Sequence, residues 1–165
     1  MRRLALATTL LLPAAAMAQV PDPDVAALVP SILSPYGPAL AALAGWTVLT
    51  MVLTFVSTAG TPRSRAQSGL PVRDYADPAY RRSRAHLNAV ETSGPFIAAL
   101  LAAILTQASP VWVNGFAAVF LLARVGMAAV HIGTESQPLR SACFALGQIC
   151  VISLAGMGIY AAFAP

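Results

Sequence analysis

Three polar side chains repeat at helical spacing near the middle of the chain. Arg84, Asn88 and Glu91 are separated by four and then three residues, so an α-helix would place a guanidinium, an amide and a carboxylate on one face. The residues that follow are mostly apolar, and lipid rejects such a polar face unless protein covers it. Two interpretations stay open: a binding surface that points into a helix bundle, or a helix start with a snorkelling arginine and a satisfied carboxylate.

Another charged residue lies inside an apolar run. Arg124 follows Leu121-Leu122-Ala123, and a guanidinium at the centre of a membrane helix costs about 2.5–3.5 kcal/mol on insertion scales. If the segments on either side of Ala108–Ser109 form a tight antiparallel hairpin, residues at equal depth have numbers that sum to about 217. Arg124 then lies within one helical turn of Glu91. We expect a buried Glu91–Arg124 ion pair, either within one subunit or across an interface.

The remaining polar groups near the apolar segments are few. His131 stands seven residues after Arg124 and shares its helix face, where a lone histidine serves either packing or binding. Arg140 opens the last apolar segment. The two histidines and the two cysteines, Cys143 and Cys150, are too scattered to converge on a tetrahedral site. We therefore expect no metal.

The composition excludes an ordinary soluble domain. Of the 165 residues, 58% are hydrophobic and 10% are charged, where soluble domains carry about a quarter charged residues. The positive net charge comes from arginine without any lysine. These arginines cluster beside apolar segments, which is a topology signal more often than a nucleic-acid surface. We therefore expect membrane lipids, and no nucleic acid, around the protein.

The apolar segments predict an all-α membrane protein with four transmembrane helices in one bundle. Their expected bounds are 38–59, 82–106, 111–133 and 140–163. Residues 1–18 have the basic start, short apolar middle and small-residue exit of a signal peptide, with an uncleaved signal anchor as the alternative. Residues 19–37 are rich in proline, and we expect them to form an irregular lead-in outside the cytoplasm. The arginines of the mature chain gather at one side, which the positive-inside rule assigns to the cytoplasm.

One segment resembles a known family signature. Arg84-Ala85-His86-Leu87-Asn88-Ala89-Val90-Glu91, followed by Pro95-Phe96, resembles the R-A-x-x-N-x-x-E signature and downstream P-F of the MAPEG family (membrane-associated proteins in eicosanoid and glutathione metabolism). Ala123-Arg124 and Pro138-Leu139-Arg140-Ser141 resemble the pattern of its third and fourth helices. The resemblance covers roughly residues 38–163 and is to bacterial-type members. It implies a left-handed four-helix bundle in a bacterial inner membrane, assembled as a homotrimer with sites between subunits near the cytoplasmic face.

The resemblance also implies a ligand and its binding residues. In glutathione-using relatives, the positions of Arg84, Asn88 and Glu91 hold the tripeptide, and the arginine at the position of Arg140 stabilises its thiolate. Glutathione carries two carboxylates and one amine, which suit cationic, amide and carboxylate partners in one pocket. A guanidinium near the sulfur lowers the pKa of the thiol and raises the thiolate fraction at neutral pH.

Three positions that are tyrosines in glutathione-binding members differ here, and they are Thr92, Met127 and His131. His131 keeps a hydrogen-bonding ring and is included among the expected binding residues. One functional hypothesis is an enzyme that uses glutathione as co-substrate to conjugate or reduce lipophilic electrophiles or hydroperoxides arriving from the bilayer. The alternative is a non-catalytic bundle of the same fold with a structural or lipid-binding role. A proton-coupled exporter is disfavoured because residues 38–59 contain no acidic side chain.

Overall fold

The computed structural model describes residues 23–60 and 62–164 of the chain. The signal peptide predicted for residues 1–18 lies outside these residues. The chain divides into two units, Met1–Ser34 and Pro35–Pro165. In the first unit, α1 spans Pro23–Leu33, so the prediction of an irregular lead-in is wrong over this stretch. Its first residue is a proline, whose missing N–H has no helical partner to lose at that position.

The second unit contains four long helices within the described residues, α2 (Gly37–Thr58), α3 (Pro78–Leu105), α4 (Pro110–Gly133) and α5 (Gln137–Phe163). Four helical stretches that include them are long and apolar enough to cross a membrane. Each of the four helices has a proline in its first turn, where proline favours helix initiation. The all-α, four-span class predicted from the sequence is confirmed. The largest shift of a helix start is at α3, which begins four residues before the expected Arg82.

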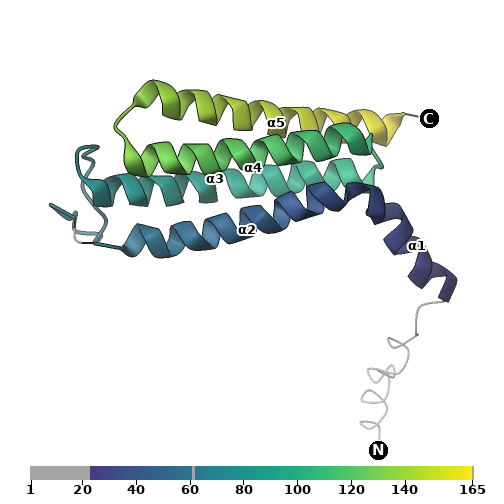
Figure 1. Ribbon diagram of the computed structural model, residues 1–165, viewed down its shortest axis with the longest axis horizontal. Coiled ribbons are helices and arrows are strands. Elements are labelled where there is room, and N and C mark those ends of the chain that lie inside the picture. Colours follow the sequence, from purple (N-terminus) through teal and green to yellow (C-terminus); the bar gives the residue numbers. More distant parts are fainter. Residues whose placement is uncertain (1–22, 61, 165) are drawn as a thin grey trace, which may run out of the picture. The chain divides into compact units, whose positions relative to one another are not determined.

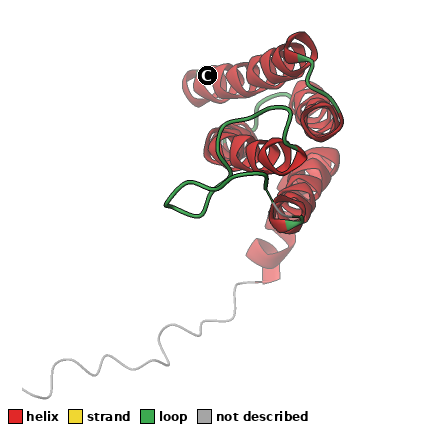
Figure 2. Cartoon of the chain, turned by 90° about the vertical axis from the view of Figure 1, so that its left-hand side faces the viewer, coloured by secondary structure: helices red, strands yellow, loops and turns green. Residues whose placement is uncertain are grey.

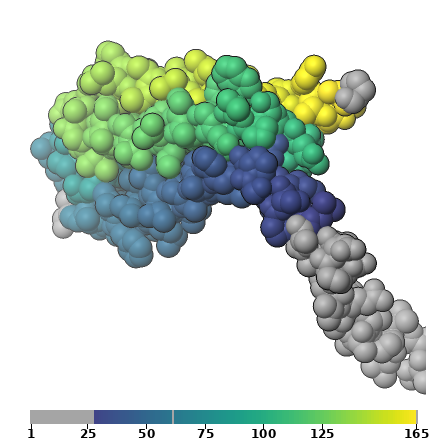
Figure 3. Space-filling view, turned by 45° about the vertical axis from the view of Figure 1, so that its right-hand side comes forward, coloured from purple at the N-terminus to yellow at the C-terminus, as the bar shows by residue number. Residues whose placement is uncertain are grey.

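The middle pair of helices, α3 and α4, carries most of the packing. Each contacts the other and both outer helices, α2 and α5, as the ribbon and the end-on view show (Figures 1 and 2). The surface view shows α2 and α4 side by side on one face of the bundle (Figure 3). Short turns join α3 to α4 and α4 to α5, so successive helices run antiparallel. The α2–α3 connection and the α4–α5 turn therefore meet at the same end of the bundle.

Three aromatic side chains fill the centre of the bundle. Phe96 and Phe120 stack with their ring centroids 3.8 Å apart, and Trp46 meets Phe120 edge-on at 5.2 Å. The indole Nε1 of Trp46 donates a hydrogen bond to Ser93 Oγ at 3.2 Å. All three rings are buried, so this cluster ties α2, α3 and α4 together at mid-depth.

Neutral hydrogen bonds hold the end of the bundle that carries the α3–α4 turn. The Tyr36 hydroxyl donates to the backbone carbonyl of Ala108. Asn114 accepts from the backbone N–H of Ala39 at 3.1 Å and donates to the carbonyl of Pro35 at 2.8 Å. We call this the sealed end, because side chains from two helices fasten the start of α2 directly to the turn and to α4.

At the other end an arginine completes the C-terminus of α2. Arg82 donates from Nε and Nη2 to the backbone carbonyl of Ala59, at 3.1 and 2.7 Å. The next residue, Gly60, has a φ of +79°, and a Cβ there would lie 2.6 Å from Arg82 Nη2. Only glycine meets both demands without strain. The end of α2 is thus fastened to the start of α3.

Candidate functional site

A cavity of about 570 Å³ opens where the α2–α3 connection meets the α4–α5 turn. We call it the polar cavity. Its walls come from the connection and from three helices, and it is lined by Arg73, Tyr75, Arg84, Asn88, Met127, His131, Glu135, Gln137, Arg140, Ser141 and Phe144. Four of the five predicted ligand-binding or catalytic residues, Arg84, Asn88, His131 and Arg140, come together here from α3, α4 and α5.

Glu91 is the predicted residue that does not line this cavity. Its side chain is 60% exposed, and Oε1 lies 4.0 Å from Nη1 of Arg84. The helical spacing therefore brought the two charged groups onto one face, as expected. Glu91 lies near the midpoint of α3, and in a single chain it faces away from the bundle, so protein cover for this carboxylate must come from outside the described chain if the helix spans a bilayer.

Arg140 forms the α5 wall of the polar cavity, and an aromatic ring holds it in place. The guanidinium lies over the ring of Tyr75, with Cζ 4.3 Å from the ring centroid. Arg140 is buried, and its Nη1 has no hydrogen-bond partner among the described residues. A buried guanidinium nitrogen without a partner is costly, so this atom is available for an acceptor on a ligand.

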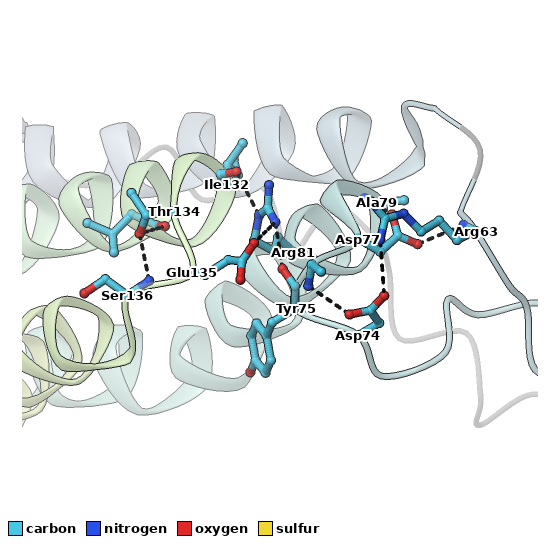
Figure 4. Close-up of polar contacts among 12 residues, drawn as sticks. Arg63, Asp74, Tyr75, Asp77, Ala79, Arg81, Ile132, Thr134, Glu135 and Ser136 are labelled. Carbon is cyan, nitrogen blue, oxygen red and sulfur yellow. Dashed lines mark hydrogen bonds and ion pairs between the residues drawn. The ribbon is translucent and has the colours of Figure 1, made fainter.

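Arg81 fixes the Tyr75 segment of the α2–α3 connection, as the close-up shows (Figure 4). Its Nη1 donates to the backbone carbonyl of Tyr75 at 2.7 Å, and its Nε donates to the carbonyl of Ile132 at 3.3 Å. Glu135 lies 3.6 Å from the same Nη1. Arg81 thus joins the connection to the end of α4, and the one carboxylate in the cavity wall, that of Glu135, is paired with a cation. Sequence analysis missed Tyr75 because an irregular connection offers no periodicity.

Asp77 fixes the same connection to the first turn of α3 (Figure 4). Oδ1 accepts from the backbone N–H of Ala79, and Oδ2 accepts from the backbone N–H of Arg63, each at 2.9 Å. The hydrogen bond from Arg63 is the main cause that holds the pKa of this carboxyl below its usual value, because it favours the charged form. The connection that carries Tyr75 is therefore pinned at its beginning and at its end.

His131 and Met127 form the α4 wall of the polar cavity, one helical turn apart. Both side chains are buried. His131 Nδ1 has no hydrogen-bond partner among the described residues, so the ring retains the capacity to bind a ligand, and its role as a binding residue stays a prediction. Met127 offers only a thioether sulfur, which is a weak acceptor. At these two positions the cavity wall therefore offers one imidazole and one soft apolar surface.

Arg124 lies just outside the cavity and does not pair with Glu91 within the described chain. Its Nη1 donates instead to Asn88 Oδ1 at 3.2 Å and lies 3.3 Å from the sulfur of Met127. The side chain extends along α4 toward the polar end of the bundle, which is the direction in which a buried arginine reaches polar groups. An ion pair with Glu91 across an interface stays a prediction.

The chemistry of the polar cavity is that of an anion site. Arg73, Arg84 and Arg140 line it, while its one carboxylate is already paired. No group of three His, Cys, Asp or Glu side chains able to hold a metal ion occurs in the described part of the chain. An acceptor-rich, negatively charged small molecule is the ligand class that these walls complement.

The family follows from comparison with known proteins. The model of the MAPEG family matches residues 40–160. This chain belongs to the MAPEG family. No curated protein matches it. The matched region of this MAPEG protein runs from the first turn of α2 nearly to the end of α5, so it contains every helix that lines the polar cavity. Together with the four membrane-spanning helices, membership makes it a multi-pass membrane protein.

Proposed function

We propose that this MAPEG protein is a glutathione-dependent membrane enzyme that transfers glutathione to lipophilic electrophiles or reduces lipophilic hydroperoxides. The observation that carries the proposal is the buried Nη1 of Arg140, which has no hydrogen-bond partner among the described residues and lies at a cavity also lined by Arg84 and Asn88. Glutathione at neutral pH has two carboxylates and an ionisable thiol, and these groups complement the cationic walls.

Arg140 would act on the sulfur of bound glutathione. A guanidinium beside a thiol stabilises the thiolate, which is the nucleophile, and so lowers the pKa of that thiol. Tyr75 supports this role because its ring lies on the guanidinium of Arg140. In conjugation, the thiolate sulfur forms a bond to the electrophilic carbon, and the leaving group departs with the electron pair of the broken bond.

The lipophilic partner would enter from the side of the bundle. Phe144 lines the polar cavity and is itself partly exposed on α5, so an apolar edge of the cavity faces the surroundings of the helices. In a bilayer those surroundings are hydrocarbon. We place the polar cavity at the cytoplasmic side, because the arginines of the connection and of the α4–α5 end follow the positive-inside rule.

A homotrimer would supply the protein cover that Glu91 lacks in one chain. Glu91 is exposed in one chain although it stands at the midpoint of α3, and membrane-embedded carboxylates face protein or water. A second copy packed against this face would cover Glu91, and the amine of bound glutathione would be a charged partner for its carboxylate. Glu91→Gln is expected to weaken assembly in detergent, measured by analytical ultracentrifugation. Unchanged assembly and unchanged glutathione affinity in this variant would exclude both roles for Glu91.

The decisive experiment is calorimetric titration of glutathione into the detergent-purified protein. We expect saturable binding and an ultraviolet thiolate signal from the bound tripeptide at neutral pH. Arg84→Ala should reduce the affinity about 10- to 100-fold, as expected for the loss of a charged hydrogen bond. Arg65→Ala is the matched control, because Arg65 is an exposed arginine of the same connection that does not line the cavity. Absence of binding by the unmodified protein would favour a non-catalytic bundle.

A further inference from the structure

The guanidinium of Arg124 is buried among apolar groups in α4. The residue is 3% exposed, and its Cζ lies 5.1 Å from the ring centroid of Phe120 and 5.3 Å from that of Phe144. Its one polar side-chain oxygen partner within the described residues is Asn88, whose Oδ1 accepts from Nη1 at 3.2 Å. Burying a guanidinium is costly. The Asn88 amide is therefore the group through which Arg124 can affect the polar cavity.

This contact decides which end of the Asn88 amide faces the polar cavity. A guanidinium has donors and no acceptor, so the atom that meets it must be the amide oxygen. With Oδ1 held by Arg124, the group left for a ligand is the Nδ2 amide, which only donates. Asn88 lines the polar cavity, whereas Arg124 does not. The positive charge behind the amide also polarises its N–H bonds and strengthens them as donors.

We propose that Arg124 is a positioning residue that fixes Asn88 as a hydrogen-bond donor, so that this point of the cavity selects a carboxylate. A ligand group that presents an N–H there would meet a second donor and would be rejected. The proposal deepens the proposed function, on which it rests, because it assigns one carboxylate of glutathione to Asn88. Arg124 acts only through Asn88 and does not touch the ligand.

Gly147 on α5 provides the space that the guanidinium needs. A Cβ at this position would lie 2.8 Å from Nε and 2.9 Å from Nη2 of Arg124. Those atoms are the far end of a flexible side chain, so Gly147→Ala should push the guanidinium aside without displacing a helix. Gly147 does not line the polar cavity. This substitution therefore disturbs the contact between Arg124 and Asn88 from behind and leaves the ligand-facing atoms unchanged.

The test compares glutathione with two derivatives, in each of which one carboxylate is replaced by a carboxamide. The derivative that lacks the carboxylate facing Asn88 should bind the unmodified protein about tenfold more weakly than glutathione, because it loses the charged hydrogen bond to Asn88. Gly147→Ala should reduce this ratio severalfold, and Asn88→Ala should reduce it at least as much. In the Asn88→Ala background, Gly147→Ala should have no further effect on the ratio. Gly156→Ala is the control, since a Cβ there meets nothing within 4 Å.

The proposal is overturned if Gly147→Ala and Arg124→Gln both retain the full preference for the carboxylate. It is also overturned if Gly147→Ala alters the ratio equally when Asn88 is absent. If glutathione does not bind at all, the proposed function fails. Titration with acetate and with acetamide then tests whether Arg124 fixes Asn88 as a hydrogen-bond donor. The nitrogen-15 signal of the Asn88 side-chain amide is then expected to shift with acetate only, and Gly147→Ala should reduce that shift.

Discussion

The two ends of the bundle each have a cavity, and the larger one carries less chemistry. The cavity near the sealed end has a volume of about 680 Å³ and is lined by Thr106, Gln107, Ala108, Ser109, Trp112, Ser153, Gly156, Met157, Tyr160, Ala161 and Ala164. None of these described lining residues has a charged side chain. The polar cavity is smaller, yet it contains three arginines and two of the buried nitrogen atoms that lack a partner in the described chain.

The two cavities differ more in chemistry than in volume. Proteins satisfy nearly all buried polar groups, so unpartnered donors around a cavity indicate a ligand, a partner chain or water. The cavity near the sealed end has no such atom among the described residues. We expect lipid to fill this cavity without specific recognition, because its lining consists of apolar and uncharged polar groups. The experiments below test whether the two ends differ in this way.

The largest expected effect is from Arg140→Ala. Removal of this guanidinium should raise the thiol pKa of bound glutathione by about one unit, so the thiolate signal would titrate at higher pH. Trp112→Ala, which alters the cavity near the sealed end, should leave that titration unchanged. Ultraviolet titration of the bound tripeptide measures both variants. Equal shifts of the thiol pKa in the two variants would show that the polar cavity is not the specific site of glutathione.

The contacts that hold the two ends should respond differently to pH. Asn114→Ala removes the neutral hydrogen bonds of the sealed end and should lower stability by about 1–2 kcal/mol at every pH. Asp77→Ala should lower the melting temperature only where the carboxyl is ionised. Since the folded pKa of Asp77 is lowered, its stabilisation is complete above the unfolded pKa near 3.8 and is lost as the pH falls through the folded pKa.

Thermal unfolding in detergent at several pH values checks this contrast. The deficit of Asp77→Ala relative to the unmodified protein should shrink on acidification, while the deficit of Asn114→Ala should stay constant. A deficit of Asp77→Ala that persisted unchanged well below the folded pKa would show that the carboxylate does not stabilise the connection through its charged form.

The smallest effect is expected from the ring that supports Arg140. Tyr75→Leu should weaken glutathione binding about two- to fivefold, which corresponds to the loss of a cation–π contact. Tyr75→Phe keeps the ring and should bind like the unmodified protein. Calorimetric titration compares the two variants. If the phenylalanine variant binds as weakly as the leucine variant, the hydroxyl rather than the ring face of Tyr75 is what matters.

The sequence was sufficient to predict the four long helices, because each apolar stretch has the length of a membrane span and turn residues separate the stretches. Helical spacing also brought Arg84 and Asn88 to one cavity with His131 and Arg140. Prediction was poorer where the backbone is irregular: the spacing of residues says nothing about Tyr75 in the connection. Of the two alternatives for a Glu91–Arg124 ion pair, the one within a single chain does not hold, because the long side chain of Arg124 reaches Asn88, more than a turn away from the level of its Cα.

The hydrogen bonds around Asn114 have a consequence for how the helices can separate. They fasten α2 to the neighbouring helix and turn at one extremity through uncharged groups, which dissolved salt does not screen. At the opposite end α2 is held by the charged guanidinium of Arg82, so we expect movement of α2 away from its neighbours to be larger there than near Asn114. A hydrocarbon molecule could enter between the helices at the end with the α2–α3 connection, while the sealed end holds α2 against α4. High ionic strength should weaken only the charged contacts at the end with the α2–α3 connection.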